Sequence, residues 1–167
     1  MIFGGIVLRI GYGFDAHRLA PHRKLVLGGV QIDYPLGLEG HSDADVLIHA
    51  IIDALLGAAG MGDIGMLFPD TDPSYEGVSS LRLLSETVSR ITPLGFEISN
   101  VDVTLFAERP KIGPYREQIA QNVADAIGVH RSRVNIKATT TEELGFVGRR
   151  EGMAAAAVAL LNETKNA

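Results

Sequence analysis

Histidine and aspartate recur at every fourth position in one segment of this 167-residue chain, at His41, Asp45, His49 and Asp53. Residues four apart lie close to one face of an α-helix. A helix over 42–59 would therefore gather the last three side chains on one side. A polar stripe is usually the solvent-exposed face of an amphipathic helix. This stripe contains only residue types that bind metals, so a structural and a functional interpretation both stay open.

A second His/Asp pair follows a short apolar run near the start of the chain, at Asp15 and His17. Residues two apart on a strand point to the same side, although an Asx-turn in a loop is the alternative. With His49, this pair supplies three nitrogen and oxygen ligands, the pattern of a catalytic zinc site with one open position. Manganese, iron or cobalt would also suit these ligands. Asp45 and Asp53 are expected to orient the histidine ligands from behind.

Three further segments carry groups that could bind phosphate or cations. Glycines and aspartates in 62–72 could bring backbone amides and carboxylates to a ligand, unless this is an ordinary loop. Threonine hydroxyls in 137–143 could cradle phosphate, and Glu142 could hold magnesium, although a helix capping box is the simpler alternative. Arginines in 148–152 could clamp phosphate or form a solvated cluster before a helix.

One glycine motif is set aside. Gly11 to Ala16 follows an apolar run and has the form GxGxxA, as in dinucleotide-binding folds. That motif must open a helix inside a βαβ unit, and no such helix fits before the polar segment that begins at His17.

Charge is unevenly distributed along the chain. Residues 25–81 contain nine acids and no lysine or arginine, within a net charge of −5. Such a segment must bind cations or meet basic residues from elsewhere in the fold, and the acidic balance argues against nucleic acid as a partner. The longest apolar runs are too short for a membrane helix. We interpret residues 1–10 as a first strand rather than a signal peptide, and the absence of cysteine suits a reducing cytoplasm.

The expected elements alternate irregularly. We predict strands at 7–11, 24–27, 30–34, 97–107 and 133–138, and helices at 42–59, 79–91, 115–127 and 151–161. The first strand is expected to end in a glycine turn, Ser42 to cap the first helix with Asp45 completing a capping box, and 62–77 to be a loop. These elements predict an α+β fold in one domain, 1–167, with a mixed four-stranded sheet, helices mainly on one face and a small β-hairpin.

Five ordered motifs together resemble one enzyme family. They are Gly11-Tyr-Gly-Phe-Asp-Ala-His17, His41-Ser-Asp-Ala-Asp45, Gly62-Asp-Ile-Gly65, Phe68-Pro-Asp-Thr-Asp-Pro73 and Lys137-Ala-Thr-Thr-Thr-Glu142. This order is similar to that of the 2-C-methyl-D-erythritol 2,4-cyclodiphosphate synthase family, over about 9–161. Only the apolar leader 1–8 departs from the family pattern.

The resemblance implies an intramolecular phosphoryl transfer in the non-mevalonate isoprenoid pathway. In this family, the 2-phosphate of 4-diphosphocytidyl-2-C-methyl-D-erythritol 2-phosphate attacks the β-phosphorus, and CMP leaves as a cyclic diphosphate forms. Such chemistry needs positioning and charge neutralisation more than a covalent nucleophile. A metal-dependent phosphatase or nucleotidase with the same ligands, and a non-catalytic metal-binding trimer, are the alternatives.

The resemblance also implies site residues. Zn²⁺, or another divalent transition metal, is expected at Asp15, His17 and His49, and Mg²⁺ or Mn²⁺ at Glu142. His41 and Thr140 are the expected catalytic residues. The expected substrate contacts are Asp15, His17, His41, Ser42, Asp63, Ile64, Gly65, Phe68, Pro69, Asp70, Thr71, Asp72, Ala107, Glu108, Arg109, Pro110, Lys111, Ile112, Gly113, Thr139, Thr140, Thr141, Glu142, Phe146 and Arg149.

Family members are homotrimers with active sites between subunits, so the resemblance implies the same assembly here. Phe14, Phe146 and Arg149 match positions that line a cavity on the trimer axis, where an isoprenoid diphosphate is expected to bind.

Overall fold

The computed structural model describes residues 7–164, so most of the apolar leader lies outside the described residues. Five strands form one mixed sheet in the order β4-β1-β7-β5-β6. Their bounds are β1 Val7–Pro21, β4 Leu36–Leu38, β5 Phe96–Phe106, β6 Val134–Thr139 and β7 Gly152–Glu163. The predicted α+β class and mixed sheet are confirmed, but the sheet has five strands rather than four. The predicted hairpin is also confirmed, as β2 Leu25–Leu27 and β3 Val30–Ile32, which pair only with each other.

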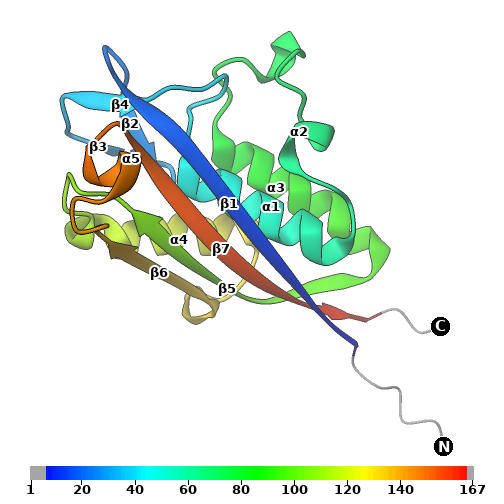
Figure 1. Cartoon of the computed structure of the whole chain (residues 1–167). Helices are drawn as coiled ribbons and strands as arrows, with labels where there is room; N and C mark the ends of the chain where they lie inside the picture. The colour runs from blue at the N-terminus through cyan, green and yellow to red at the C-terminus, as the bar shows by residue number, and fades with distance from the viewer. Residues whose placement is uncertain (1–6, 165–167) are drawn as a thin grey trace, which may run out of the picture.

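The described residues form five helices, and the three long ones lie behind the sheet, as Figure 1 shows. They are α1 Val46–Ala59, α2 Ile64–Leu67, α3 Ser80–Ile91, α4 Arg116–Ile127 and α5 Gly145–Gly148, with short 3-10 turns at Pro73–Tyr75, Thr92–Leu94, Gly113–Tyr115 and Arg131–Arg133. The helices predicted at 79–91 and 115–127 are confirmed, whereas the predicted loop 62–77 contains α2 and a 3-10 turn. No helix between residues 7 and 164 combines the length and apolar character that a membrane crossing requires.

The prediction of a final helix at 151–161 is wrong, because this segment is strand β7 in the middle of the sheet. Its alanines favour a helix by less than about 1 kcal/mol per residue. As a strand, the same backbone pairs with β1 on one side and β5 on the other. Ala155, Ala157 and Ala159 are buried at alternate positions, and that two-residue period belongs to a strand.

The first strand and the first helix also differ from their predicted bounds. Strand β1 does not turn at Gly11 but continues to Pro21, and it pairs with β7 along twelve residues. Helix α1 begins at Val46, and its N-cap is Asp45 rather than Ser42. Ala44 has a positive φ of 56°, which interrupts any helix before this point. The Ser42 hydroxyl accepts a hydrogen bond from the Ala44 amide and turns toward His49 instead.

Two glycines on β1 allow α1 to lie directly on the sheet. A Cβ at Gly11 would collide with the carbonyl oxygen of Ala54, and one at Gly13 with that of Ala50. The backbones of β1 and α1 are therefore in contact, which no residue with a side chain would permit. Asp15 follows on the same face of β1, opposite the first turns of α1.

The glycine contact predicts a specific cost of substitution. Gly13→Ala should lower the free energy of unfolding by about 1–3 kcal/mol, because the methyl group forces α1 away from β1. Urea denaturation measures this change. Gly57→Ala is the matched control on α1, because its Cβ would meet only the Tyr12 carbonyl oxygen at 3.9 Å. A Gly13→Ala protein as stable as the control variant would contradict this account of the packing.

Candidate active site

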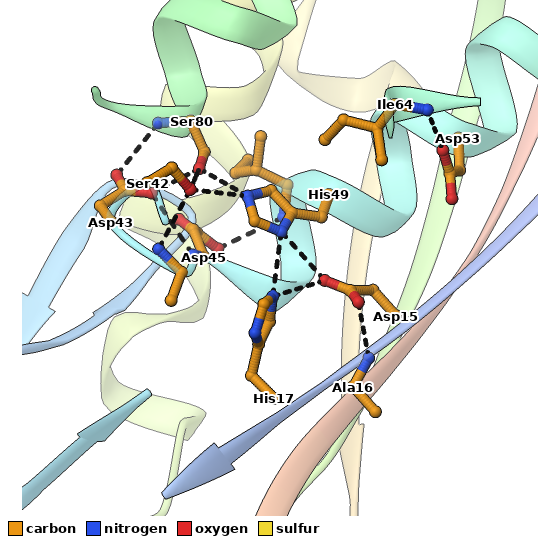
Figure 2. A network of polar contacts seen from close by, with 12 residues as sticks. Asp15, Ala16, His17, Ser42, Asp43, Asp45, His49, Asp53, Ile64 and Ser80 are labelled. Carbon is orange, nitrogen blue, oxygen red and sulfur yellow. Dashed lines mark hydrogen bonds and ion pairs between the residues drawn. The ribbon is translucent and has the colours of Figure 1, made fainter. Parts of the chain in front are cut away.

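Three ligand atoms converge where β1 faces α1 (Figure 2). Asp15 Oδ2 lies 2.9 Å from His17 Nε2 and 3.0 Å from His49 Nδ1. The two histidine nitrogens are 3.1 Å apart. Among the described residues these side chains form a group that could hold a metal ion. The alternation of β1 brings Asp15 and His17 to the same face, as the sequence predicted, and α1 supplies His49 from above.

The charges of this cluster stabilise one another. Burial raises the pKa of the Asp15 carboxyl, but hydrogen bonds from His17 and His49 outweigh burial and hold it well below its usual range. For His17, burial lowers the pKa, and the Asp15 carboxylate overcomes this effect and raises it. A divalent cation at the same atoms would displace these protons and take over the role of partner to the carboxylate.

The ring of His17 is also fixed from behind. Its Nδ1 lies 2.6 Å from the carbonyl oxygen of Glu39. A carbonyl oxygen only accepts hydrogen bonds, so Nδ1 donates, and Nε2 is the nitrogen directed at Asp15, where it can bind a cation once the proton it shares with the carboxylate is displaced. Two imidazole nitrogens and one carboxylate oxygen are a donor set that fits zinc and related transition metals.

The expectation that Asp45 and Asp53 orient the histidine ligands is wrong. Asp45 accepts hydrogen bonds from the amides of Ile48 and Gly29, at 3.3 and 2.8 Å. Asp53 accepts from the amide of Ile64 at 2.8 Å, on the far side of the cluster in Figure 2. Burial raises the pKa of Asp45 to about 6, against the opposing effect of amide hydrogen bonds from Gly29 and Gly28. These two carboxylates hold backbone segments together rather than imidazole rings.

The cluster opens into a cavity of about 460 Å³, here called the metal-side pocket. It is lined by Asp15, His17, Gly40, His41, Ser42, His49, Ile64, Gly65, Phe68, Asp70, Tyr75 and Leu83. The structure thus brings residues from four sequence motifs to one cavity. Sequence reasoning missed Gly40, Tyr75 and Leu83, which belong to none of the motifs that the sequence singled out.

A separate cavity of about 520 Å³, here called the basic pocket, lies at the ends of β5 and β6. It is lined by Ala107, Glu108, Arg109, Pro110, Lys111, Ile112, Gly113, Pro114, Arg116, Ala138, Thr139, Thr140, Glu143 and Arg150. All seven residues predicted between Ala107 and Gly113 are here. Four basic side chains, from Arg109, Lys111, Arg116 and Arg150, make the pocket suitable for an anion. Arg150 and Glu143 come from the two segments 148–152 and 137–143 in which the sequence indicated phosphate-binding groups, whereas Pro114 and Arg116 were not predicted to contribute.

The two pockets are apart within one chain. Pairing places Asp15, Ala155, Leu105 and Ala138 in one row across the sheet. With two strands between β1 and β6 and about 4.8 Å per step, Asp15 and Ala138 are roughly 14 Å apart.

The remaining predicted residues line neither pocket. They are Asp63, Pro69, Thr71, Asp72, Thr141, Glu142, Phe146 and Arg149. Asp63 and Asp72 accept hydrogen bonds from the amides of Met66 and Ser74, at the starts of two short helices. Glu142 lies outside the cluster of Asp15 and accepts a hydrogen bond from the Thr140 hydroxyl at 3.0 Å, beside the basic pocket.

Relatives of known name support the sequence resemblance. The YgbB family model matches residues 8–162. A 2-C-methyl-D-erythritol 2,4-cyclodiphosphate synthase from Desulfatibacillum aliphaticivorans is 59% identical over 154 residues, which cover 92% of this chain and 99% of that protein. A protein of the same name from Syntrophotalea carbinolica is 55% identical over 157 residues, which cover 94% and 96%.

Solved structures share the fold. The bifunctional IspDF of Campylobacter jejuni is 43% identical with a TM-score of 0.92 and covers 95% of this chain, which spans only 43% of that longer protein. The IspF–CDP complex of Plasmodium falciparum is 33% identical with a TM-score of 0.83, and the match covers 95% of this chain and 97% of that one. Because these matches extend over nearly the whole sequence and the whole sheet, this chain belongs to the YgbB family.

Proposed function

We propose that this chain converts 4-diphosphocytidyl-2-C-methyl-D-erythritol 2-phosphate to 2-C-methyl-D-erythritol 2,4-cyclodiphosphate and CMP, a step of the non-mevalonate isoprenoid pathway. The names of relatives 52–59% identical to it support this function. One observation carries the proposal. The cluster of Asp15, His17 and His49 opens into the pocket that also contains His41 and Ser42. Metal ligands beside phosphate-binding side chains suit phosphoryl transfer.

The reaction needs no covalent enzyme intermediate. An oxygen of the 2-phosphate attacks the β-phosphorus, the bond from that phosphorus to the oxygen of CMP breaks, and CMP leaves with the bonding electrons. Positioning the two phosphates and neutralising their charge is sufficient for such a transfer. The protein is accordingly a cyclising, CMP-releasing phosphorus–oxygen lyase.

The proposed metals are Zn²⁺, or another divalent transition metal, at Asp15, His17 and His49, and Mg²⁺ or Mn²⁺ at Glu142. Bound divalent cations would polarise phosphoryl oxygens and neutralise their charge. His17 and His49 would supply imidazole nitrogens to the transition metal, and Asp15 would supply the negative charge. Glu142 would hold its cation from a loop that also carries the Thr140 hydroxyl, 3.0 Å from its carboxylate.

The two pockets would hold opposite ends of the substrate. His41 and Ser42 contact the 2-phosphate in the metal-side pocket, and Thr140 contacts the diphosphate from the opposite side. The basic pocket receives the cytidine, and the segment 62–72 covers the ribose and the methylerythritol. Arg109 and Lys111 draw the phosphates toward this pocket by their charge.

We further propose a homotrimer whose active sites lie between subunits. Five large apolar side chains on the open face of the sheet are 43–73% exposed: Leu8, Ile10, Tyr12, Phe14 and Val158. A continuous exposed apolar face is typical of a protein contact surface. The separation of the two pockets within one chain supports pairing the metal-side pocket of one copy with the basic pocket of another.

An isoprenoid diphosphate would bind on the trimer axis, in contact with Phe14, Phe146 and Arg149. Arg149 forms an ion pair with Glu151 at 2.8 Å, and it would have to break this pair to bind the diphosphate. The 167 residues would act as one domain. The absence of cysteine suits a cytoplasmic location.

The reaction itself is the first prediction. Purified protein with the cytidyl substrate, zinc and magnesium should release CMP and a cyclic diphosphate in equal amounts, as followed by phosphorus NMR. Chelation should abolish the reaction. Release of inorganic phosphate in place of a cyclic product would favour the metallophosphatase alternative.

The metal cluster predicts a selective loss of binding. His49→Ala should lose bound zinc and nearly all activity yet keep its helix content, because alanine is a better helix former than histidine. Metal analysis of dialysed protein and circular dichroism measure these two effects. His130→Ala, which removes an exposed histidine far from the cluster, is the matched control and should keep its zinc. Equal zinc content in the two variants would exclude His49 as a ligand.

Shared active sites predict complementation between inactive variants. His49→Ala damages the metal-side pocket and Thr140→Ala the basic pocket. In a cyclic trimer that contains both, one of three sites joins two intact halves, so mixed oligomers should recover about one third of wild-type activity. Differently tagged chains allow these oligomers to be isolated.

The control pairs two defects in the same half. Mixtures of His49→Ala with Asp15→Asn should stay inactive, because no arrangement gives an intact metal-side pocket. If the first mixture also stayed inactive while the mixed trimers were present, each site would belong to a single chain.

A further inference from the structure

The side of His49 that is turned away from the metal cluster faces two serine hydroxyls. Its Nε2 lies 3.0 Å from Ser80 Oγ and 3.1 Å from Ser42 Oγ, as Figure 2 shows. Ser80 is the first residue of α3, has no exposed surface and does not line the metal-side pocket. A fully buried hydroxyl in this position needs a reason beyond contact with a substrate.

The hydrogen of the Ser80 hydroxyl is directed at Asp43. The Ser80 hydroxyl donates to Asp43 Oδ1, and the Ser80 amide donates to Asp43 Oδ2 at 3.0 Å. The amide of Asp45 also donates to Oδ1, at 3.3 Å. A carboxylate that receives three donors acts only as an acceptor. The single hydroxyl hydrogen of Ser80 is therefore directed at Asp43 and is not available to His49.

Ser80 therefore acts as an acceptor for the ring of His49. Because Ser80 Oγ has no hydrogen left for the ring, it accepts one from His49 Nε2. The other ring nitrogen, Nδ1, lies 3.0 Å from Asp15 Oδ2, and once a cation displaces the proton between these two atoms Nδ1 carries the lone pair that binds it. In His17, the Glu39 carbonyl oxygen accepts from Nδ1 in the same way. Both imidazoles thus keep a hydrogen on the nitrogen outside the cluster and direct the other nitrogen at the ligand atoms.

We infer that Ser80 and Asp43 are positioning residues that hold His49 in its metal-binding tautomer and orientation. The inference rests on the proposed metal centre and adds two residues to it. Ser42 Oγ is 3.1 Å from the same nitrogen and accepts from the Ala44 amide; its own hydrogen has Ser80 Oγ, 3.4 Å away, and the pocket as alternative acceptors. Because Ser80 accepts the hydrogen bond from His49, the Ser42 hydroxyl remains available to contact the substrate.

The first test removes the hydroxyl. Ser80→Ala should weaken zinc binding by about 10- to 100-fold, the usual effect of losing a hydrogen-bond partner behind a metal ligand. The dissociation constant is measured on metal-free protein by competition with a chromophoric chelator. Ser80→Thr keeps the hydroxyl and should restore most of the affinity.

Thr87→Ala is the matched control for this variant. Thr87 is also a fully buried hydroxyl on α3, but it donates to the Leu83 carbonyl oxygen within the helix. Its loss should leave the zinc dissociation constant unchanged. Equal zinc affinity in Ser80→Ala and wild type, or an equal loss in Thr87→Ala, would overturn the inference.

The second test reverses the hydrogen-bond chain. In Asp43→Asn, the side-chain amide can donate to Ser80 Oγ, and the Ser80 hydroxyl then donates to His49 Nε2. Nitrogen-15 shifts of the metal-free protein should show His49 Nε2 protonated in the wild type and unprotonated in the variant. A purely structural role of Asp43 would not change the tautomer. A proton on Nε2 in both proteins would contradict the assignment.

These measurements separate the inference from the proposed function. A wild-type protein that binds no zinc would refute the metal centre. The ring-nitrogen shifts of the same metal-free protein would still decide whether Asp43 and Ser80 set the tautomer of His49.

Discussion

The contact between the backbones of β1 and α1 is the constraint on which the rest of the structure depends. Gly11 and Gly13 have no side chains to hold the helix away, so the carbonyl oxygens of Ala54 and Ala50 lie against the strand. This closeness lets His49, which directly precedes Ala50, reach the two ligands on β1. Larger side chains at the two glycine positions would force the helix away from the strand and would separate the ligands. The metal cluster thus depends on the two glycines of β1.

Polar groups around the cluster are organised before any ligand binds. The Glu39 carbonyl oxygen and the Ser80 hydroxyl fix the two imidazole rings, and Asp45 ties the start of α1 to the hairpin through Gly29. Every buried side-chain nitrogen and oxygen of the described residues has a hydrogen-bond partner. Side chains held in this way lose little conformational freedom when a cation binds. This raises the affinity for the cation without any additional ligand.

The charge pattern of the sequence becomes intelligible once the two pockets are seen. The acidic segment 25–81 supplies most of the metal-side pocket, and the basic pocket is built from residues beyond position 106. Both pockets lie at the same end of the sheet, but one has an acidic and the other a basic lining. A substrate with several phosphates would suit both only if cations neutralised the negative charge of the acidic one. The open apolar face of the sheet offers the surface through which copies of the chain would combine these halves.

By itself, the sequence determined the ligand types, their spacing and the α+β pattern, because four-residue and two-residue periods act locally along one helix and one strand. The metal cluster followed from these patterns, whereas the expectation for Ala107 to Gly113 came only from the family resemblance. Only the tertiary structure decided that the alanine-rich end is a central strand, since pairing on both sides outweighs a small helical preference. It also decided which polar groups lie behind the histidines: Asp43 accepts from Ser80, 37 positions away, and Ser80 contacts His49. No local spacing can reveal a contact that exists only after α3 packs against α1.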